Sequence, residues 1–122
     1  MSDTQKRLIE KLKREFGHQI MAALNDPEVI EIMLNDDGTL WLERMGQEME
    51  CIGTPKINAK AFIGTIASFL GTTITPENPI LECELPIDGS RFEGLIPPVV
   101  AKPAFTIRKK ASKIFTLEDY LA

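Results

Sequence analysis

The spacing of apolar residues changes along this chain, and the changes restrict what it can fold into. Apolar side chains recur every three or four residues in two segments, about 3–24 and 58–70, which is the period of an α-helix. Elsewhere they alternate with polar side chains, as where Leu81, Cys83 and Leu85 are interleaved with Glu82 and Glu84. Alternation with a period of two is typical of a strand that has one solvated face. The pattern therefore predicts two amphipathic helices and several half-buried strands.

Turn residues divide the alternating segments into about six strands. Asn35-Asp36-Asp37-Gly38 predicts a hairpin between strands at about 30–34 and 40–45, and a third strand at about 48–52 follows Gly46-Gln47. Strands at about 81–85 and 91–96 flank Asp88-Gly89, and the last strand covers about 104–109. We therefore expect an α+β domain with a mainly antiparallel sheet, an N-terminal amphipathic helix and a second helix packed on it.

The helix ends carry recognisable signals. Asp3 or Thr4 can cap the first helix, and Gly17 is expected to loosen it. Asn58 precedes the second helix as a cap, and Gly71 is placed to end it.

Length, cysteines and histidine exclude several classes of protein. The 122 residues suit one domain, and no apolar run approaches the roughly 20 residues that span a bilayer. Cys51 and Cys83 form no CxxC motif, so we interpret them as reduced, inert thiols in the core. His18 is the only histidine, and the Asp36-Asp37 pair is better explained by a turn than by a metal, so no metal site is expected.

Charge is unevenly distributed around a net value of −4. Basic residues gather in 6–14 and again in 102–113, whereas 26–50 is acidic. The basic, amphipathic first helix suits peripheral contact with anionic lipid, although its apolar stripe is more typical of packing on the protein's own sheet. Arg108-Lys109-Lys110 is a short basic run, but with this net charge we consider nucleic-acid binding unlikely.

Three segments carry a resemblance to a known family: NDPEVIEIMLNDDGTLWLERMG, ELPIDGSRFEGLIPPVVAKPAFTIRKK and IFTLEDYLA. In this order they resemble the N-terminal domain of the TrbB-like, conjugal-transfer branch of the type IV secretion traffic ATPases. The resemblance covers about residues 24–122. It implies a PAS-like N-terminal domain of a homohexameric ring ATPase at the cytoplasmic face of the bacterial inner membrane. Such ATPases power secretion or conjugative transfer and contact inner-membrane secretion components.

The resemblance also implies a domain that this chain does not contain. A P-loop requires GxxxxGK[ST] to hold phosphates, and none of the eight glycines precedes a lysine. We therefore expect residues 1–115 to be the N-terminal domain and residues 116–122, which begin with a capping threonine, to start a linker helix to a missing RecA-like motor. ATP and Mg²⁺ would bind to the full-length protein, and this fragment would be inactive alone.

Arg91 and Arg108 are the candidate site residues. Each alternates with apolar residues of its strand, so each is expected on the polar face of the sheet. In the resembling family, arginines in these segments reach the nucleotide phosphates, and the planar guanidinium binds phosphate oxygens in pairs. A surface salt bridge, for instance between Arg91 and Glu84, is the simpler interpretation. The stiff 97–103 loop either fixes the two strands or is a plain connection.

A different class of protein remains open on the residues alone. The chain is also compatible with a stand-alone PAS-like interaction or sensor module that has no ATPase domain. A GxxxxGK[ST] motif encoded downstream of residue 122 would favour the ATPase, and a stop codon there would favour the module.

Overall fold

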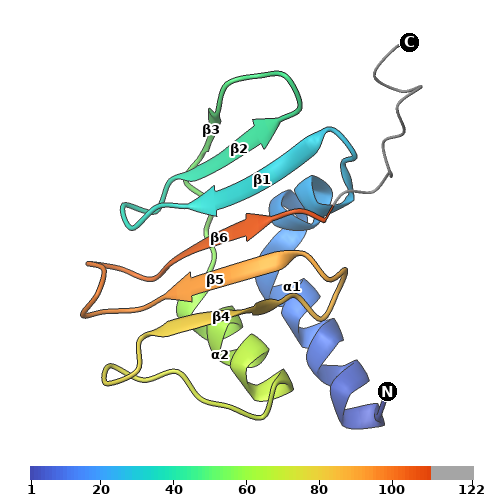
Figure 1. Ribbon diagram of the computed structural model, residues 1–122, viewed down its shortest axis with the longest axis vertical. Helices are drawn as coiled ribbons and strands as arrows, with labels where there is room; N and C mark the ends of the chain where they lie inside the picture. The colour runs from blue at the N-terminus through green and yellow to red at the C-terminus, as the bar shows by residue number, and fades with distance from the viewer. Residues whose placement is uncertain (111–122) are drawn as a thin grey trace, which may run out of the picture.

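Two helices and six strands make up residues 1–110, which are the residues that the computed structural model describes (Figure 1). The linker helix expected from Thr116 lies outside them. The elements in chain order are α1 (Asp3–Asn25), β1 (Val29–Leu34), β2 (Leu40–Arg44), β3 (Glu50–Gly53), α2 (Ala59–Phe69), β4 (Ile80–Glu84), β5 (Arg91–Leu95) and β6 (Ala104–Arg108). The expected α+β class is confirmed, and the predicted strands are found with ends shifted by one or two residues.

The six strands form one antiparallel sheet in the order β3-β2-β1-β6-β5-β4. Two three-stranded meanders, β1-β2-β3 and β4-β5-β6, are joined because β1 pairs with β6. In that central pairing Glu31 lies opposite Arg108 and Leu34 opposite Phe105. Segments more than seventy residues apart in the sequence are thus neighbours at the middle of the sheet.

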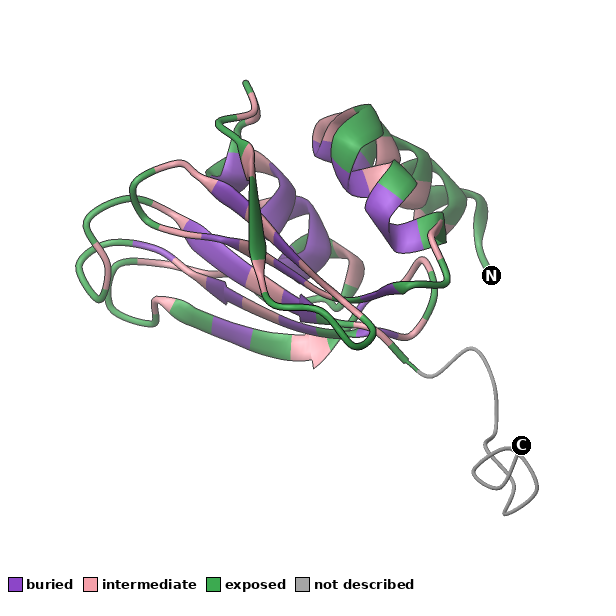
Figure 2. Ribbon diagram, turned by 90° about the horizontal axis from the view of Figure 1, so that it is seen from above, coloured by how far each residue is buried: buried purple, intermediate pink, exposed green. Residues whose placement is uncertain are grey.

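Both helices cover the same face of the sheet, and the other face is open (Figure 2). Four phenylalanines join the layers: Phe16 of α1, Phe62 of α2, Phe92 of β5 and Phe105 of β6 are each at most 1% exposed. The ring centroids of Phe62 lie 4.8 Å from Phe16 and 5.2 Å from Phe105, both in edge-to-face geometry. Aromatic rings favour this arrangement because the positive ring edge meets the negative ring face. This aromatic cluster fixes the two helices against the sheet.

α1 starts and bends at residues that follow simple backbone rules. Ser2, not Asp3 or Thr4 as expected, is the N-cap: the Gln5 amide donates to Ser2 Oγ at 3.1 Å. The Ser2 amide donates in turn to Gln5 Oε1, which completes a capping box. Gly17, with φ 77° and ψ 173°, interrupts the helix as predicted, since glycine tolerates positive φ.

α2 packs closely on β5 because Gly94 carries no side chain. A Cβ atom at Gly94 would lie 2.9 Å from Phe92 Cε1 and 3.1 Å from two atoms of Ile63 on α2. The predicted cap of α2 is present, since Asn58 Oδ1 accepts from the Ala61 amide at 3.1 Å. The buried face of β5 is therefore set by helix packing, which leaves its other face to carry charge.

Candidate functional site

Arg91 and Arg108 lie directly opposite each other on neighbouring antiparallel strands. Arg91 is the first residue of β5, Arg108 is the last of β6, and their Cα atoms are register partners. The apolar neighbours Phe92 and Ile107 are fully buried on the helix side. The prediction that both arginines project from the polar face is therefore confirmed. Like charges directly opposite each other destabilise a sheet, so this pair is unfavourable unless an anion offsets it.

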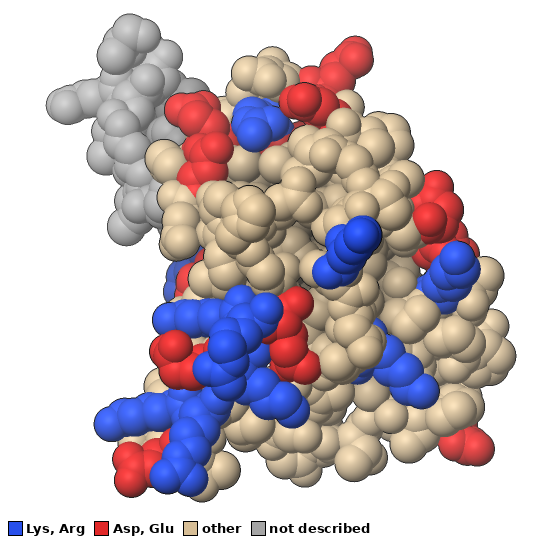
Figure 3. All heavy atoms as spheres, turned by 180° about the vertical axis from the view of Figure 1, so that it is seen from behind, with Lys and Arg blue, Asp and Glu red and all other residues tan. Residues whose placement is uncertain are grey.

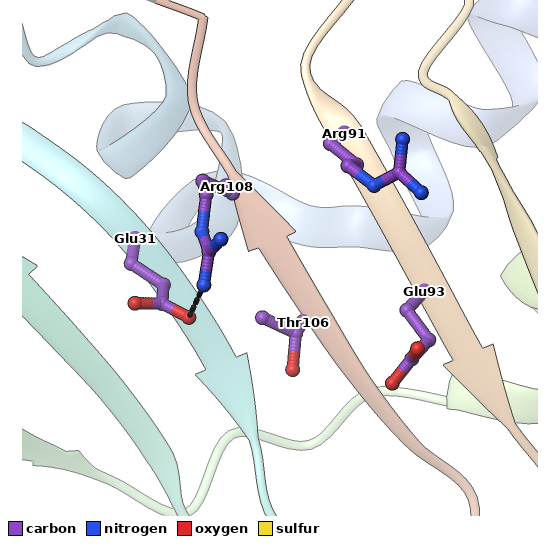
Figure 4. Close-up of a pocket in the computed structure, with 5 residues that line it drawn as sticks. All are labelled: Glu31, Arg91, Glu93, Thr106 and Arg108. Carbon is purple, nitrogen blue, oxygen red and sulfur yellow. Dashed lines mark ion pairs between the residues drawn. The ribbon is translucent and has the colours of Figure 1, made fainter.

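The two arginines border an open hollow of about 300 Å³ on the uncovered face (Figure 4). Thr106, Glu31 and Glu93 complete its lining. The hollow thus offers two guanidinium groups and a hydroxyl to an anion, and two carboxylates that oppose one. This donor set suits a phosphate group better than a neutral ligand, because guanidinium binds phosphate oxygens through paired N–H groups.

Strand order sets a row of charges across this face. From β2 to β4 the register partners run Glu43, Glu31, Arg108, Arg91 and Glu84. Two adjacent glutamates are therefore followed by two adjacent arginines, and Glu84 lies at the other end of the row. The alternation within each strand predicts which residues face outward, but it does not predict that β1 lies beside β6. For that reason the sequence alone does not identify Glu31 as a neighbour of Arg108.

The two guanidinium groups turn away from each other. Arg108 Nη2 lies 3.9 Å from Glu31 Oε1, and the Arg91 guanidinium extends away from Arg108 (Figure 4). Within residues 1–110 Arg91 has no carboxylate oxygen within 4.0 Å, so the salt bridge considered between Arg91 and Glu84 is absent. The sheet fixes where the two side chains start, and both side chains are exposed on the open face.

A second acid of the hollow has a perturbed carboxyl group. A hydrogen bond with the Glu82 side chain raises the pKa of Glu93, desolvation and the negative charge of Glu82 raise it further, and Arg91 opposes these effects. The cause is again a cross-strand neighbour, since Glu82 of β4 is the register partner of Glu93. Glu93 is therefore easier to protonate than an ordinary glutamate.

The 97–103 loop lies far from the arginines along the strands. Leu95 and Ala104 are the register partners next to this loop, whereas Arg91 and Arg108 end the same two strands at their opposite ends. The loop instead approaches the β1–β2 turn, where the Ala101 amide lies 3.5 Å from Asp36 Oδ2. The two cations are thus brought together by strand pairing and not by the stiff loop between them.

The basic run at 108–110 is divided by the fold. Arg108 points to the open face, while the Lys109 ammonium donates to the backbone oxygens of Ala23, at 3.2 Å, and Asp26. Burial lowers the pKa of Lys109, and the carboxylates of Asp26 and Asp88 partly offset this. Lys109 therefore satisfies carbonyl groups at the C-terminal end of α1, where a positive charge is favourable. The run does not form one continuous basic patch.

Basic side chains do gather over α1. In the view from behind they cluster at the lower left, interspersed with acids (Figure 3). Lys6, Arg7, Lys11 and Arg14 are exposed there, whereas Leu12 and Phe16 face the core. None of the helices among residues 1–110 is both long and apolar enough to cross a membrane.

The cysteines differ from the expectation of two core thiols. Cys83 is half-buried and burial raises its thiol pKa, but Cys51 is exposed on β3. The expectation was wrong because β3 is an edge strand in which Ile52 packs against the core, whereas the adjacent Cys51 lies on the open face. Residues 1–110 contain no group of three or more Asp, Glu, His and Cys residues that could hold a metal ion. Asp37 instead accepts hydrogen bonds from the amide and hydroxyl of Thr39, as expected of a turn residue.

Comparison with known proteins places the chain among conjugation and secretion proteins. No family model matches it. It is 49% identical over 116 residues to a probable conjugal transfer protein TrbB of Sinorhizobium fredii, covering 94% of this chain and 36% of that protein. The corresponding match to TrbB of Rhizobium radiobacter is 48% over 117 residues, with the same coverage. The type IV secretion system protein VirB11 of Bartonella henselae is 33% identical over 105 residues, covering 82% of this chain and 29% of that protein.

A solved structure has the same fold. The crystal structure of the VirB11 ATPase from the Brucella suis type IV secretion system, in complex with sulphate, aligns with a TM-score of 0.84 at 24% identity. The alignment covers 98% of this chain and 36% of that one. The chain thus spans about a third of the length of the TrbB relatives it matches. Sequence identity and fold together show that it belongs to the TrbB and VirB11 family, and that it corresponds to the N-terminal region of those proteins.

Proposed function

We propose that this chain is the N-terminal domain of a hexameric ATPase that powers type IV secretion or conjugative transfer. In this proposal, the open face of the sheet closes over ATP that is bound, with Mg²⁺, by a RecA-like motor domain. Arg91 and Arg108 then contact the phosphates. The observation that carries the proposal is the direct cross-strand pairing of these two arginines above an open hollow.

The pairing of Arg91 with Arg108 has an electrostatic cost. Two opposed cations weaken the isolated sheet slightly, whereas a phosphate chain placed between them turns repulsion into two charge-assisted contacts. Permanent charge suits the task, because guanidinium stays protonated at any physiological pH. Phosphoryl transfer is accelerated mainly by positioning and by neutralising charge, which is the chemistry that two arginines supply.

The other surfaces suggest roles in assembly. We infer that α1, with its exposed basic residues, faces anionic lipid or inner-membrane secretion components, while neighbouring subunits pack elsewhere to form the ring. The apolar side of α1 is occupied by the protein's own core, so lipid contact would be electrostatic and peripheral. This arrangement corresponds to a protein at the cytoplasmic face of the inner membrane.

Steady-state ATP hydrolysis by the full-length protein tests the proposal. Arg91→Ala and Arg108→Ala should each lower turnover on the order of 10²-fold, because each removes a contact to developing phosphate charge. Lysine at either position should restore only part of the activity, since it keeps the charge and loses the planar fork. Arg44→Ala is the control, because Arg44 is paired with Glu50 near the sheet edge. Normal turnover in both hollow variants would contradict the proposal, as would hydrolysis by residues 1–122 alone.

A further inference from the structure

Glu31 is much less exposed than the arginine with which it forms an ion pair beside the hollow. Its side chain is 17% exposed, whereas that of Arg108, its partner at 3.9 Å, is 73% exposed. Its register partner on the other side is Glu43 of β2, which carries the same charge. Arg108 is therefore the cation that offsets a half-buried carboxylate next to a second carboxylate.

The ion pair also determines where the Arg108 guanidinium lies. The group is turned toward β1 and away from Arg91 (Figure 4). An anion seated between the two arginines needs both guanidinium groups to turn inward over Thr106. For Arg108 that movement means leaving Glu31.

We propose that Glu31 competes with phosphate for Arg108. The Glu31 carboxylate holds the Arg108 guanidinium away from Arg91 until a multiply charged phosphate chain displaces that carboxylate. The inference rests on the proposed phosphate-binding role of the hollow and adds how that site is regulated. Glu31 would make binding weaker and more selective, because a singly charged anion cannot offset the loss of the Arg108 partner.

Electrostatic considerations support the proposal that Glu31 opposes phosphate binding. A carboxylate removed from water is costly to leave without a partner, so moving Arg108 away carries a penalty that the incoming anion must exceed. Glu43 increases this penalty, since it repels Glu31 whenever Arg108 is withdrawn. With Glu31 and Glu93 both charged, the hollow has no net positive charge, and only a ligand of high charge density gains enough from the two guanidinium groups.

Release follows from the same competition. Once a phosphate group leaves or the chain of phosphates shortens, Glu31 is adjacent and can recover Arg108 without diffusion. A built-in competitor thus lowers affinity for the shorter product more than for the longer substrate. The substitution Glu31→Gln keeps the shape of the side chain and one acceptor oxygen, and removes this charge.

Binding of inorganic triphosphate and of inorganic phosphate to the 122-residue chain tests the inference. Nitrogen–proton correlation spectra of the arginine side chains report on Arg91 and Arg108 directly, at neutral pH and low salt. Glu31→Gln should tighten triphosphate binding by roughly three- to tenfold, and should reduce the preference for triphosphate over phosphate. Glu43→Gln removes a carboxylate one strand further from Arg108, so it should tighten triphosphate binding less than Glu31→Gln does, by under about twofold.

A double-mutant comparison separates competition from general charge. If Glu31 acts through Arg108, the gain from Glu31→Gln should largely disappear in the Arg108→Ala background. An unchanged gain in that background would overturn the inference, as would triphosphate binding no tighter in Glu31→Gln than in the wild type.

The outcomes also separate this inference from the proposed function. If Arg91→Ala and Arg108→Ala bind triphosphate as the wild type does, the phosphate role of the hollow is wrong and the competitor role falls with it. If both arginine variants lose binding while Glu31→Gln equals the wild type, the hollow remains a phosphate site and only the competitor role is wrong.

Discussion

The two faces of the six-stranded sheet differ in the interactions that they carry: apolar packing on the covered face and charges on the open face. The covered face is held by fully buried apolar side chains, with the four phenylalanines in contact between α1, α2 and the sheet. The open face carries a row of five charges in which like charges are adjacent, and its one ion pair among the described residues of that row is 3.9 Å long. Stability therefore resides mainly on the covered face, which leaves the open face able to keep unfavourable charges.

The largest expected effect comes from the covered face. Phe62→Ala should lower the free energy of unfolding by about 3–5 kcal/mol, because it removes a buried ring and leaves a cavity between Phe16 and Phe105. Chemical denaturation of the 122-residue chain measures this. Leu70→Ala is the control at the end of the same helix, where the side chain is 44% exposed. Equal losses in the two variants would contradict the assignment of stability to the aromatic cluster.

A smaller effect is expected where α2 approaches β5. Gly94→Ala should cost about 1–3 kcal/mol, because the added Cβ would lie 2.9 Å from Phe92 and 3.1 Å from Ile63. Gly64→Ala is matched to it: nothing lies within 4 Å of that Cβ, and alanine favours a helix. Thermal melts should therefore move in opposite directions. Stabilisation by Gly94→Ala would show that the layers are not in tight contact there.

On the open face, removing a charge should stabilise the protein slightly. The raised pKa of Glu93 means that folding favours its protonated form, so this contribution is present at low pH. It is lost as the pH rises from the ordinary value of 4.5 through the raised pKa. Glu93→Gln should therefore gain about 0.2–1 kcal/mol at neutral pH relative to wild type, because it removes repulsion from Glu82.

The pH series of unfolding free energies provides the check on Glu93. The advantage of Glu93→Gln over the wild type should shrink as the pH falls toward 4.5 and below. Glu50→Gln serves as the control, since Glu50 is paired with Arg44 and not with an acid. An advantage that grew on acidification would have the wrong sign for a raised carboxyl pKa.

The smallest expected effect on stability belongs to the arginines themselves. Arg91→Ala should change the free energy of unfolding of the 122-residue chain by no more than about 0.5 kcal/mol, because an exposed charge contributes little. Arg108→Ala leaves Glu31 without its partner and should therefore cost somewhat more, up to about 1 kcal/mol. Thermal melts of the two variants measure this. Small changes in stability, together with the large loss of turnover expected in the full-length protein, would show that the arginines act in binding and not in folding. A marked fall in the melting temperature would assign these side chains to the structure.

The direction in which the site's side chains point could be predicted from each strand alone. Which of these side chains become neighbours could not be predicted, because it depends on strand order. Alternation in β5 and β6 correctly sends Arg91 and Arg108 outward, since the direction of a side chain depends only on its own strand. The same rule separates Lys109 from Arg108, but only the position of α1 shows what Lys109 binds. Glu31 lies too far along the chain for any local pattern to associate it with Arg108.

The helices, the strands, most of the turns and the polar face could be predicted from the sequence, because these features follow from apolar periodicity, turn chemistry and capping within a few residues. Its resemblance to the TrbB branch also indicated the family. The pairing of β1 with β6, the capping of α1 by Ser2 instead of Asp3, and the exposure of Cys51 at the sheet edge became evident only from the folded structure. The physical reason is that strand order is chosen by how the two meanders bury their apolar faces beneath α1 and α2. That choice depends on the whole core and places Glu31 beside Arg108 as a consequence.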